Sequence, residues 1–389
     1  MSTDYWGNAR LNNFSLNQKH RLDGVRIVFG VGSLNISGGT NLILNYASAL
    51  QDVGAQVSVG FTIGEKADSA WHPKSHTLDI RPLEEFSMNF YDLGIATWWR
   101  TVEPILGLNC AKFLYFIQSL ESRFALNYED QDDKFLAAAT YMIGLPSVTV
   151  ASWLHNLIQT QTPSKAWLIQ NGIDKRLFPL KRRESSFNGS KLRVLVEGHL
   201  DVPMKGVERT FEHLSSIDDV EVWHINPTPT QSSHLSDKTF NAVALNKMHE
   251  IYSQVDVLVK MSRVEGMYGP PLEAFHAGAT AVTSKVTGYD EYAIDRVNAL
   301  LVDIDDFESM KTCVMELRDN TDLLSNLKNG ALETAENWPS VDESASSFAS
   351  LCYLILTSPS LGRINKLAAV DTLRELADSR NMPLALIGE

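Results

Sequence analysis

The sequence has few cysteines and no long apolar run. Its three cysteines, Cys110, Cys313 and Cys352, lie far apart in the 389 residues. They never approach CxxC spacing, which argues against a zinc site or a disulfide framework and favours a reducing compartment. No stretch reaches the roughly 20 apolar residues that span a bilayer. The polar N-terminal segment also lacks the apolar core of a signal peptide, and we therefore expect a cytoplasmic protein.

An excess of positive charge is also missing. The chain has 34 Lys and Arg residues against 47 Asp and Glu residues, which gives a net charge of −13. Such a chain repels a phosphate backbone, and we therefore expect no nucleic acid partner. Peripheral attachment to a membrane, for instance at its inner face, stays open because it needs only a modest apolar or basic surface.

Two parts of the chain repeat one pattern of strand-like and helix-like runs. Residues 25–61 contain a β-rich run, a glycine loop, apolar residues at helical spacing and a second β-rich run, which together predict a βαβ unit. The pattern restarts at residue 191, after the polar segment 181–190. Strands that alternate with helices indicate parallel sheets with helices on both faces.

The predicted fold is therefore α/β, with two Rossmann-like, doubly wound domains and a helical C-terminal segment. We place the first domain at 1–180, the second at 181–345 and the helical segment at 346–389. Ligands of doubly wound folds bind at the carboxyl ends of the strands, so we expect the two domains to face each other across a ligand-binding cleft.

Residues 265–282 hold two glutamates around a Gly-Pro-Pro turn and read EGMYGPPLEAFHAGATAV. Pro270 and Pro271 suit the first turn of a helix, which places Glu273 in that turn and Glu265 in the preceding loop. Free N–H groups and a positive partial charge at this end of a helix favour an anion. Capping of the helix by Glu273 would explain the pattern without a ligand. Binding of a sugar nucleotide would explain it as well, with the carboxylates accepting hydrogen bonds from its hydroxyls.

Residues at other predicted strand ends favour a ligand. Gly198 and His199 follow the first strand of the second domain, and Lys205 precedes the next helix. A lysine in that place can neutralise a diphosphate. Gly38 and Gly39 form the matching loop of the first domain, where bare backbone can approach a ligand closely.

Taken together, these motifs resemble those of glycosyltransferase family 4, whose members have the GT-B architecture of two Rossmann-like domains. The similar parts are the E-x7-E stretch at 265–273, Lys-Gly at 205–206, NGID at 171–174 and YDEYAIDRVNALLV at 289–302. The similarity extends over residues 25–317 and is densest over 198–302.

The resemblance implies a retaining hexosyltransferase of polysaccharide or glycoconjugate biosynthesis. It would move a sugar from a nucleoside diphosphate to a hydroxyl of a glycan or lipid-linked acceptor, with no metal or other cofactor. Glu265 would contact the donor sugar, Glu273 the ribose, and Lys205 would compensate the diphosphate. The backbone of the segment 269–272, which comprises Gly269, Pro270, Pro271 and Leu272, would offer N–H groups to that diphosphate.

One residue departs from the family pattern. Where the family usually has Gly-Arg, this chain has Gly198 followed by His199, and a free histidine is mostly neutral at pH 7. A neighbouring diphosphate would raise the pKa of His199. Arg263 is a candidate substitute for the missing arginine.

A narrower similarity concerns the first domain. Residues 93–105, 115–124 and 139–158 look like the corresponding parts of bacterial rhamnosyltransferases. On that basis Gln118 would border the acceptor groove. The resemblance to family 4 implies that Gly38 and Gly39 line the cleft on the same acceptor side. The sequence leaves two alternatives open: a GT-B protein that binds nucleotide sugars with little or no turnover, and a nucleotide-sugar epimerase or hydrolase.

Overall fold

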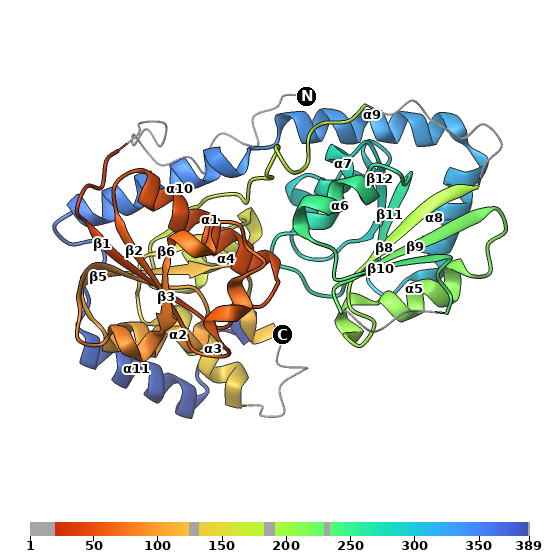
Figure 1. The fold of residues 1–389 in the computed structure, drawn as a ribbon. Coiled ribbons are helices and arrows are strands. Elements are labelled where there is room, and N and C mark those ends of the chain that lie inside the picture. The colour runs from red at the N-terminus through yellow and green to blue at the C-terminus, as the bar shows by residue number, and fades with distance from the viewer. Residues whose placement is uncertain (1–19, 124–131, 183–190, 229–233, 388–389) are drawn as a thin grey trace, which may run out of the picture. The chain divides into compact units, whose positions relative to one another are not determined.

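The computed structural model describes residues 20–123, 132–182, 191–228 and 234–387 (Figure 1). The chain forms two compact units. One unit contains the described residues up to Asn171 together with those from Val341 onwards, and the other contains Gly172–Ser340. No helix in the described part of the chain combines the length and apolar character needed to cross a bilayer.

The first unit is built on a seven-stranded parallel sheet, in which the strand order is β3-β2-β1-β4-β5-β6-β7. The order reverses next to β1, so the β1/β4 boundary is the switch point at which doubly wound folds bind ligands. The strands are β1 Arg26–Val31, β2 Gln56–Phe61, β3 Asp79–Pro82, β4 Phe90–Ala96, β5 Asn109–Ile117, β6 Ser147–Thr149 and β7 Ala166–Leu168. The α-helices are α1 Gly38–Asp52, α2 Trp99–Gly107, α3 Asp132–Met142, α4 Ser152–Gln161, α10 Val341–Thr357, α11 Lys366–Ser379 and α12 Leu384–Ile387.

The C-terminal helices complete this first unit. Phe348 of α10 packs its ring on Tyr46 of α1, with ring centroids 4.9 Å apart, and α11 packs on α3 (Figure 1). The buried ammonium of Lys112, on β5, donates to main-chain carbonyls at the end of α10, among them that of Ile355 at 2.5 Å. The sequence-based division set residues 346–389 apart as a segment of their own, whereas in the structure the helices from Val341 onwards share the core of the first unit.

The second unit is built on a six-stranded parallel sheet in the order β10-β9-β8-β11-β12-β13. Here the switch point lies between β8 and β11. The strands are β8 Leu192–Glu197, β9 Val220–Asn226, β10 Lys238–Asn241, β11 Val257–Lys260, β12 Thr280–Ser284 and β13 Ala299–Val302. The helices are α5 Val207–Leu214, α6 Leu245–Tyr252, α7 Gly269–His276, α8 Phe307–Asp319 and α9 Thr321–Asn337, with the short 3-10 helices η5 Pro203–Lys205 and η6 Tyr289–Glu291.

The predicted α/β class with two Rossmann-like domains and C-terminal helices is confirmed. Two strands were not predicted, β3 and β10, and both lie at an edge of their sheet. Edge strands need no continuous apolar run, because only one neighbour covers them. Accordingly, none of the four residues of β10 is fully buried.

Candidate functional site

The switch point of the second unit carries a buried ion pair. β8 and β11 are neighbours, with Val259 beside Val196, so the two strands end next to each other in Glu197 and Lys260. The Lys260 ammonium donates to Glu197 Oε2 at 2.5 Å and to the Glu197 carbonyl at 3.2 Å. Only 4% of the Lys260 side chain and 17% of the Glu197 side chain are exposed.

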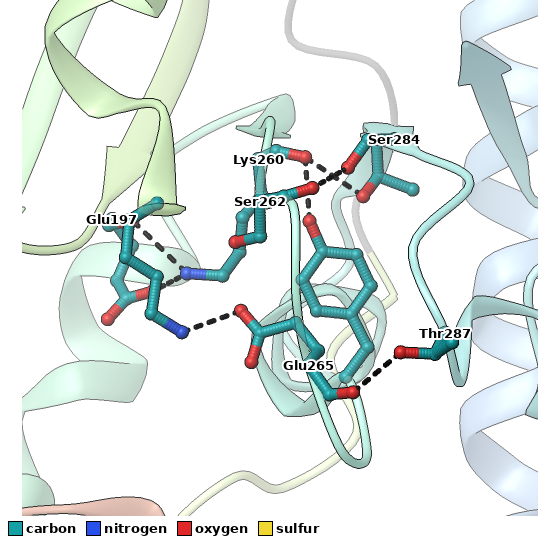
Figure 2. Close-up of polar contacts among 9 residues, drawn as sticks. Glu197, Lys260, Ser262, Glu265, Ser284 and Thr287 are labelled. Atoms are coloured by element: carbon teal, nitrogen blue, oxygen red, sulfur yellow. Dashed lines mark hydrogen bonds and ion pairs between the residues drawn. The ribbon is translucent and has the colours of Figure 1, made fainter. Parts of the chain in front are cut away.

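A second pair lies beside the first. Lys205, at the end of η5, donates to Glu265 Oε1 at 2.7 Å (Figure 2). The exposed fractions of the two side chains are 31% and 14%. The residue after the lysine must be glycine, because Gly206 has φ of 64° and a Cβ there would lie 2.4 Å from the Met261 carbonyl oxygen. The structure thus brings together two of the residues singled out in the sequence.

The main chain after β11 is fixed by hydroxyl groups. The buried Tyr268 hydroxyl donates to the Lys260 carbonyl at 2.7 Å, and Thr283 on β12 donates to the same carbonyl at 3.0 Å. Thr287 donates to the Glu265 carbonyl at 2.8 Å (Figure 2). Tyr268 and Thr283 thus tie the loop and β12 to the end of β11, and Thr287 ties the loop to the segment after β12. Glu265 is therefore presented from a loop that is held at several points.

Helix α7 begins where the Gly-Pro-Pro turn predicted it, with Gly269 as its first residue and the prolines directly behind. The prolines have no N–H group, so within residues 269–272 only Gly269 and Leu272 can offer one to a ligand. The prediction that Glu273 lies in the first turn is wrong, because that turn contains no acidic residue. The helix-capping interpretation also fails, since the residue before the helix is Tyr268 and makes no side-chain capping bond.

Glu273 instead lies one turn further along α7, among charged and phenolic groups. Burial raises its pKa to about 7, and the nearby Glu197 carboxylate acts in the same direction. Lys260 and the Tyr252 hydroxyl of α6 oppose that rise. A carboxyl group with such a pKa exists in both protonation states near neutral pH.

The lysines keep the Glu197 carboxylate ionised. Burial alone would raise the pKa of Glu197, but Lys260, together with Lys205, holds it below its usual range. Burial likewise disfavours the charged form of Lys260, but Glu197 and then Glu265 raise its pKa above the usual range. Three carboxyl groups and two ammonium groups therefore form one coupled cluster at the carboxyl end of this sheet.

Two other predicted donor residues have partners of their own. His199 Nδ1 lies 3.1 Å from Thr228 Oγ1. The Arg263 guanidinium is bound to Asp305, with Nε 2.7 Å from Oδ1. Gly198 follows β8 and has φ of 137°, a conformation that residues with a side chain rarely adopt.

In the first unit, the structure brings together the three predicted acceptor-side residues. Gly38 and Gly39 are the first residues of α1, and Gln118 follows β5. A Cβ at Gly39 would lie 2.9 Å from Gln118 Oε1, so only glycine leaves this amide in its place. Close by, the buried Glu121 accepts a hydrogen bond from the Trp99 N–H at 2.8 Å.

Glu197 and Lys260 were not predicted from the sequence. The sequence contains a pattern that could have identified them: the strand-like runs LRVLVE and VLVK end in residues of opposite charge. Charged residues are rarely buried unless they are paired, so a charge that closes a buried strand indicates a partner nearby. The partner itself emerges only when the two strands are known to be neighbours.

One protein-family model matches part of the second unit. Residues 192–320 match the family model described as Glycosyl transferases group 1. That stretch contains all five members of the cluster. Sequence comparison with curated proteins finds no significant match.

Solved structures share the fold over most of the chain. HepE from Anabaena, in complex with UDP-glucose, is similar with a TM-score of 0.69 and 14% identity, over 85% of this chain and 99% of that one. Sucrose-phosphate synthase from Thermosynechococcus elongatus is similar with a TM-score of 0.67 and 14% identity, over 85% and 98% of the two chains. WaaG, a glycosyltransferase involved in lipopolysaccharide biosynthesis, is similar with a TM-score of 0.65 and 16% identity, over 83% of this chain and 99% of that one. The chain therefore has the predicted GT-B fold.

Proposed function

We propose that this protein is a glycosyltransferase that moves a hexosyl group from a nucleoside diphosphate to a hydroxyl of a glycan or lipid-linked acceptor. The observation that carries the proposal is the cluster of two Lys–Glu pairs and Glu273 beside α7. It lies inside the stretch that matches Glycosyl transferases group 1. Membership of family 4 and of its rhamnosyltransferase-like subgroup belongs to the same proposal.

The chemical demand of the reaction is to stabilise the negative charge that builds on the leaving diphosphate. Lys205 supplies a positive charge for it, and the start of α7 supplies N–H groups and a favourable dipole. In the structure Lys205 is bound to Glu265. An arriving diphosphate therefore competes for this lysine and releases Glu265 to accept hydrogen bonds from the donor sugar. Glu273 binds the ribose hydroxyls.

The bond from the anomeric carbon to the diphosphate oxygen breaks, and a bond from that carbon to the acceptor oxygen forms on the same face of the sugar. The acceptor proton passes to the released phosphate oxygen, so no separate base is required. This step retains the anomeric configuration and uses no metal ion. Gly38, Gly39 and Gln118 contribute to acceptor binding, and the protein acts in the cytoplasm at the inner face of the membrane.

A thermal-shift panel tests the donor class. It contains UDP, GDP, dTDP, ADP and their sugar conjugates, with UDP-glucose first because HepE was solved in complex with it. A ligand at about 100 times its dissociation constant adds roughly 2.7 kcal/mol of stability. A panel in which no compound raises the unfolding temperature refutes the proposal.

Product analysis tests the reaction itself. NMR of the product with the best donor is expected to show the donor's anomeric configuration, and EDTA is expected to leave the rate unchanged. Loss of activity in EDTA that Mg²⁺ restores would contradict a metal-independent mechanism. Release of free sugar, or epimerised donor, without any acceptor would support a hydrolase or an epimerase instead. Donor binding without turnover would identify a nucleotide-sugar-binding protein.

A further inference from the structure

We propose that Glu197 and Lys260 act as a positioning pair, in which Lys260 provides the fixed positive charge of the donor site and Glu197 holds that charge in place. The inference rests on the proposed function for the identity of the ligand. Neither residue contacts the groups assigned to sugar or diphosphate by a hydrogen bond. Their effect is exerted through Lys205, Glu265 and Glu273.

Both ends of Lys260 are immobilised. Its ammonium is bound by the carboxylate and the carbonyl of Glu197, and its own carbonyl accepts from the hydroxyls of Tyr268 and Thr283 (Figure 2). Only 4% of the Lys260 side chain is exposed. Lys205, at 31% exposure, is much more accessible. The site therefore combines one fixed lysine with one that a ligand can reach.

The charge balance explains why a fixed cation is needed. With Glu273 ionised, three carboxylates face two ammonium groups. A diphosphate that draws Lys205 away leaves Glu265 without its direct partner, and Lys260 is then the buried cation whose charge still acts on Glu265. Without Lys260, three carboxylates and a single ammonium would meet the negatively charged donor. At short range and low dielectric, such repulsion is large.

Glu197 has the opposite effect on the balance. It adds a negative charge to the site, yet it is the group that holds the Lys260 ammonium. Substitutions of the two partners should therefore change diphosphate affinity in opposite directions. If the pair only supported the fold, substitution of either partner would lower diphosphate affinity, because each substitution leaves a buried charge without its partner.

The chain offers a matched control. Lys328 donates to Asp256 Oδ1 at 2.6 Å, with 4% and 5% of these side chains exposed. Asp256 directly precedes β11, so this pair lies at the opposite end of the strand that Lys260 closes. It matches the Glu197–Lys260 pair in chemistry and burial but lies away from the donor site.

The first test measures nucleotide affinity by calorimetry. The probe is whichever of UDP, GDP, dTDP and ADP binds the wild type most tightly. Lys260→Met is expected to weaken nucleotide binding about tenfold or more. Glu197→Gln is expected to tighten binding, because it removes a negative charge from the site. The same substitution should lower kcat, because Lys260 is no longer held in place. The double variant, which buries no unpaired charge and restores the charge sum, is expected to bind close to the wild-type level. Lys328→Met should change neither affinity nor kcat.

The second test needs no donor. Glu273 is observed by NMR in ¹³C-glutamate-labelled, ligand-free protein and assigned with Glu273→Gln. The titratable groups that act on it come from β8, β11, α6 and the segment after η6, namely Glu197, Lys260, Tyr252 and Tyr292. Lys260→Met should raise the pKa of Glu273, and Glu197→Gln should lower it. Each substitution should change the protonation equilibrium of Glu273 about tenfold. Lys328→Met should leave it unchanged.

The two tests separate the two proposals. If the wild type binds none of the nucleotides while the pKa of Glu273 responds as expected, the proposed function fails and the electrostatic role of the pair stands. If the wild type binds a nucleotide but both substitutions change its affinity in the same direction, the positioning role is overturned. The same holds if Lys328→Met alters the pKa of Glu273 as much as Lys260→Met does.

Discussion

Substitution of Gly206 by alanine tests how closely the position of Lys205 depends on the geometry of the neighbouring backbone. Gly206 lies directly after Lys205 and has φ of 64°, in the left-handed region. An alanine Cβ there would lie 2.4 Å from the Met261 carbonyl oxygen. That oxygen belongs to the main chain just after β11, so no side-chain rotation relieves the contact. Either η5 or the end of β11 has to move.

The expected cost follows from two terms. A left-handed conformation costs an alanine roughly 1–2 kcal/mol, and forcing extra volume into a packed site costs about 1–3 kcal/mol. We expect Gly206→Ala to lower the free energy of unfolding by about 2–5 kcal/mol, a large share of the 5–15 kcal/mol typical of a domain. Because Lys205 would move with its neighbour, nucleotide affinity should fall as well.

Urea unfolding and nucleotide calorimetry measure the two effects. Gly269→Ala serves as the stability control, because a Cβ at that position meets no atom within 4 Å and the residue begins a helix. Its unfolding midpoint should stay close to that of the wild type. If Gly206→Ala unfolded within about 0.5 kcal/mol of the wild type, the size usual for surface substitutions, the steric reasoning would be refuted.

Three further predictions concern single side chains. Lys205→Ala and Glu273→Ala should each weaken nucleotide binding in calorimetry, whereas Glu265→Ala should lower kcat more than affinity. Burial raises the pKa of Glu121 to about 8, so the native state binds a proton between about pH 5 and 8 that the unfolded state has lost, and this residue makes stability fall as pH rises through that range. Glu121→Gln should flatten that dependence in urea unfolding. Lys112→Met should lower stability by about 1–3 kcal/mol in thermal unfolding, because carbonyls at the end of α10 lose their buried donor.

Each of these has a contradicting result. Wild-type sugar transfer by all three site variants would show that the donor site is elsewhere. The control for Glu121→Gln is Glu84→Gln, because Glu84 is exposed. An equal pH dependence of stability in these two variants would contradict a raised pKa of Glu121. An unchanged unfolding temperature for Lys112→Met would show that α10 is held by apolar packing alone.

Several features could be predicted from local sequence because they depend on local chemistry. The βαβ pattern follows from the period of apolar residues, and the start of α7 follows from prolines that lack an N–H. The position of Glu273 was predicted one turn too early, because the pattern does not show which residue closes the preceding loop. Strand β3 was missed, since four residues that include Arg81 and Pro82 carry no strand period.

By itself, the sequence determined the α/β class and the start of α7 at the Gly-Pro-Pro turn. These depend on residue periods and on steric limits within a few residues. Only the tertiary structure decided that Glu197 and Lys260 share one ion pair, that Glu121 is buried, and that α10 to α12 complete the first unit. Each of these depends on which segments, far apart in the chain, exclude water from one another. Burial then sets the energy of a charge through desolvation and its partners.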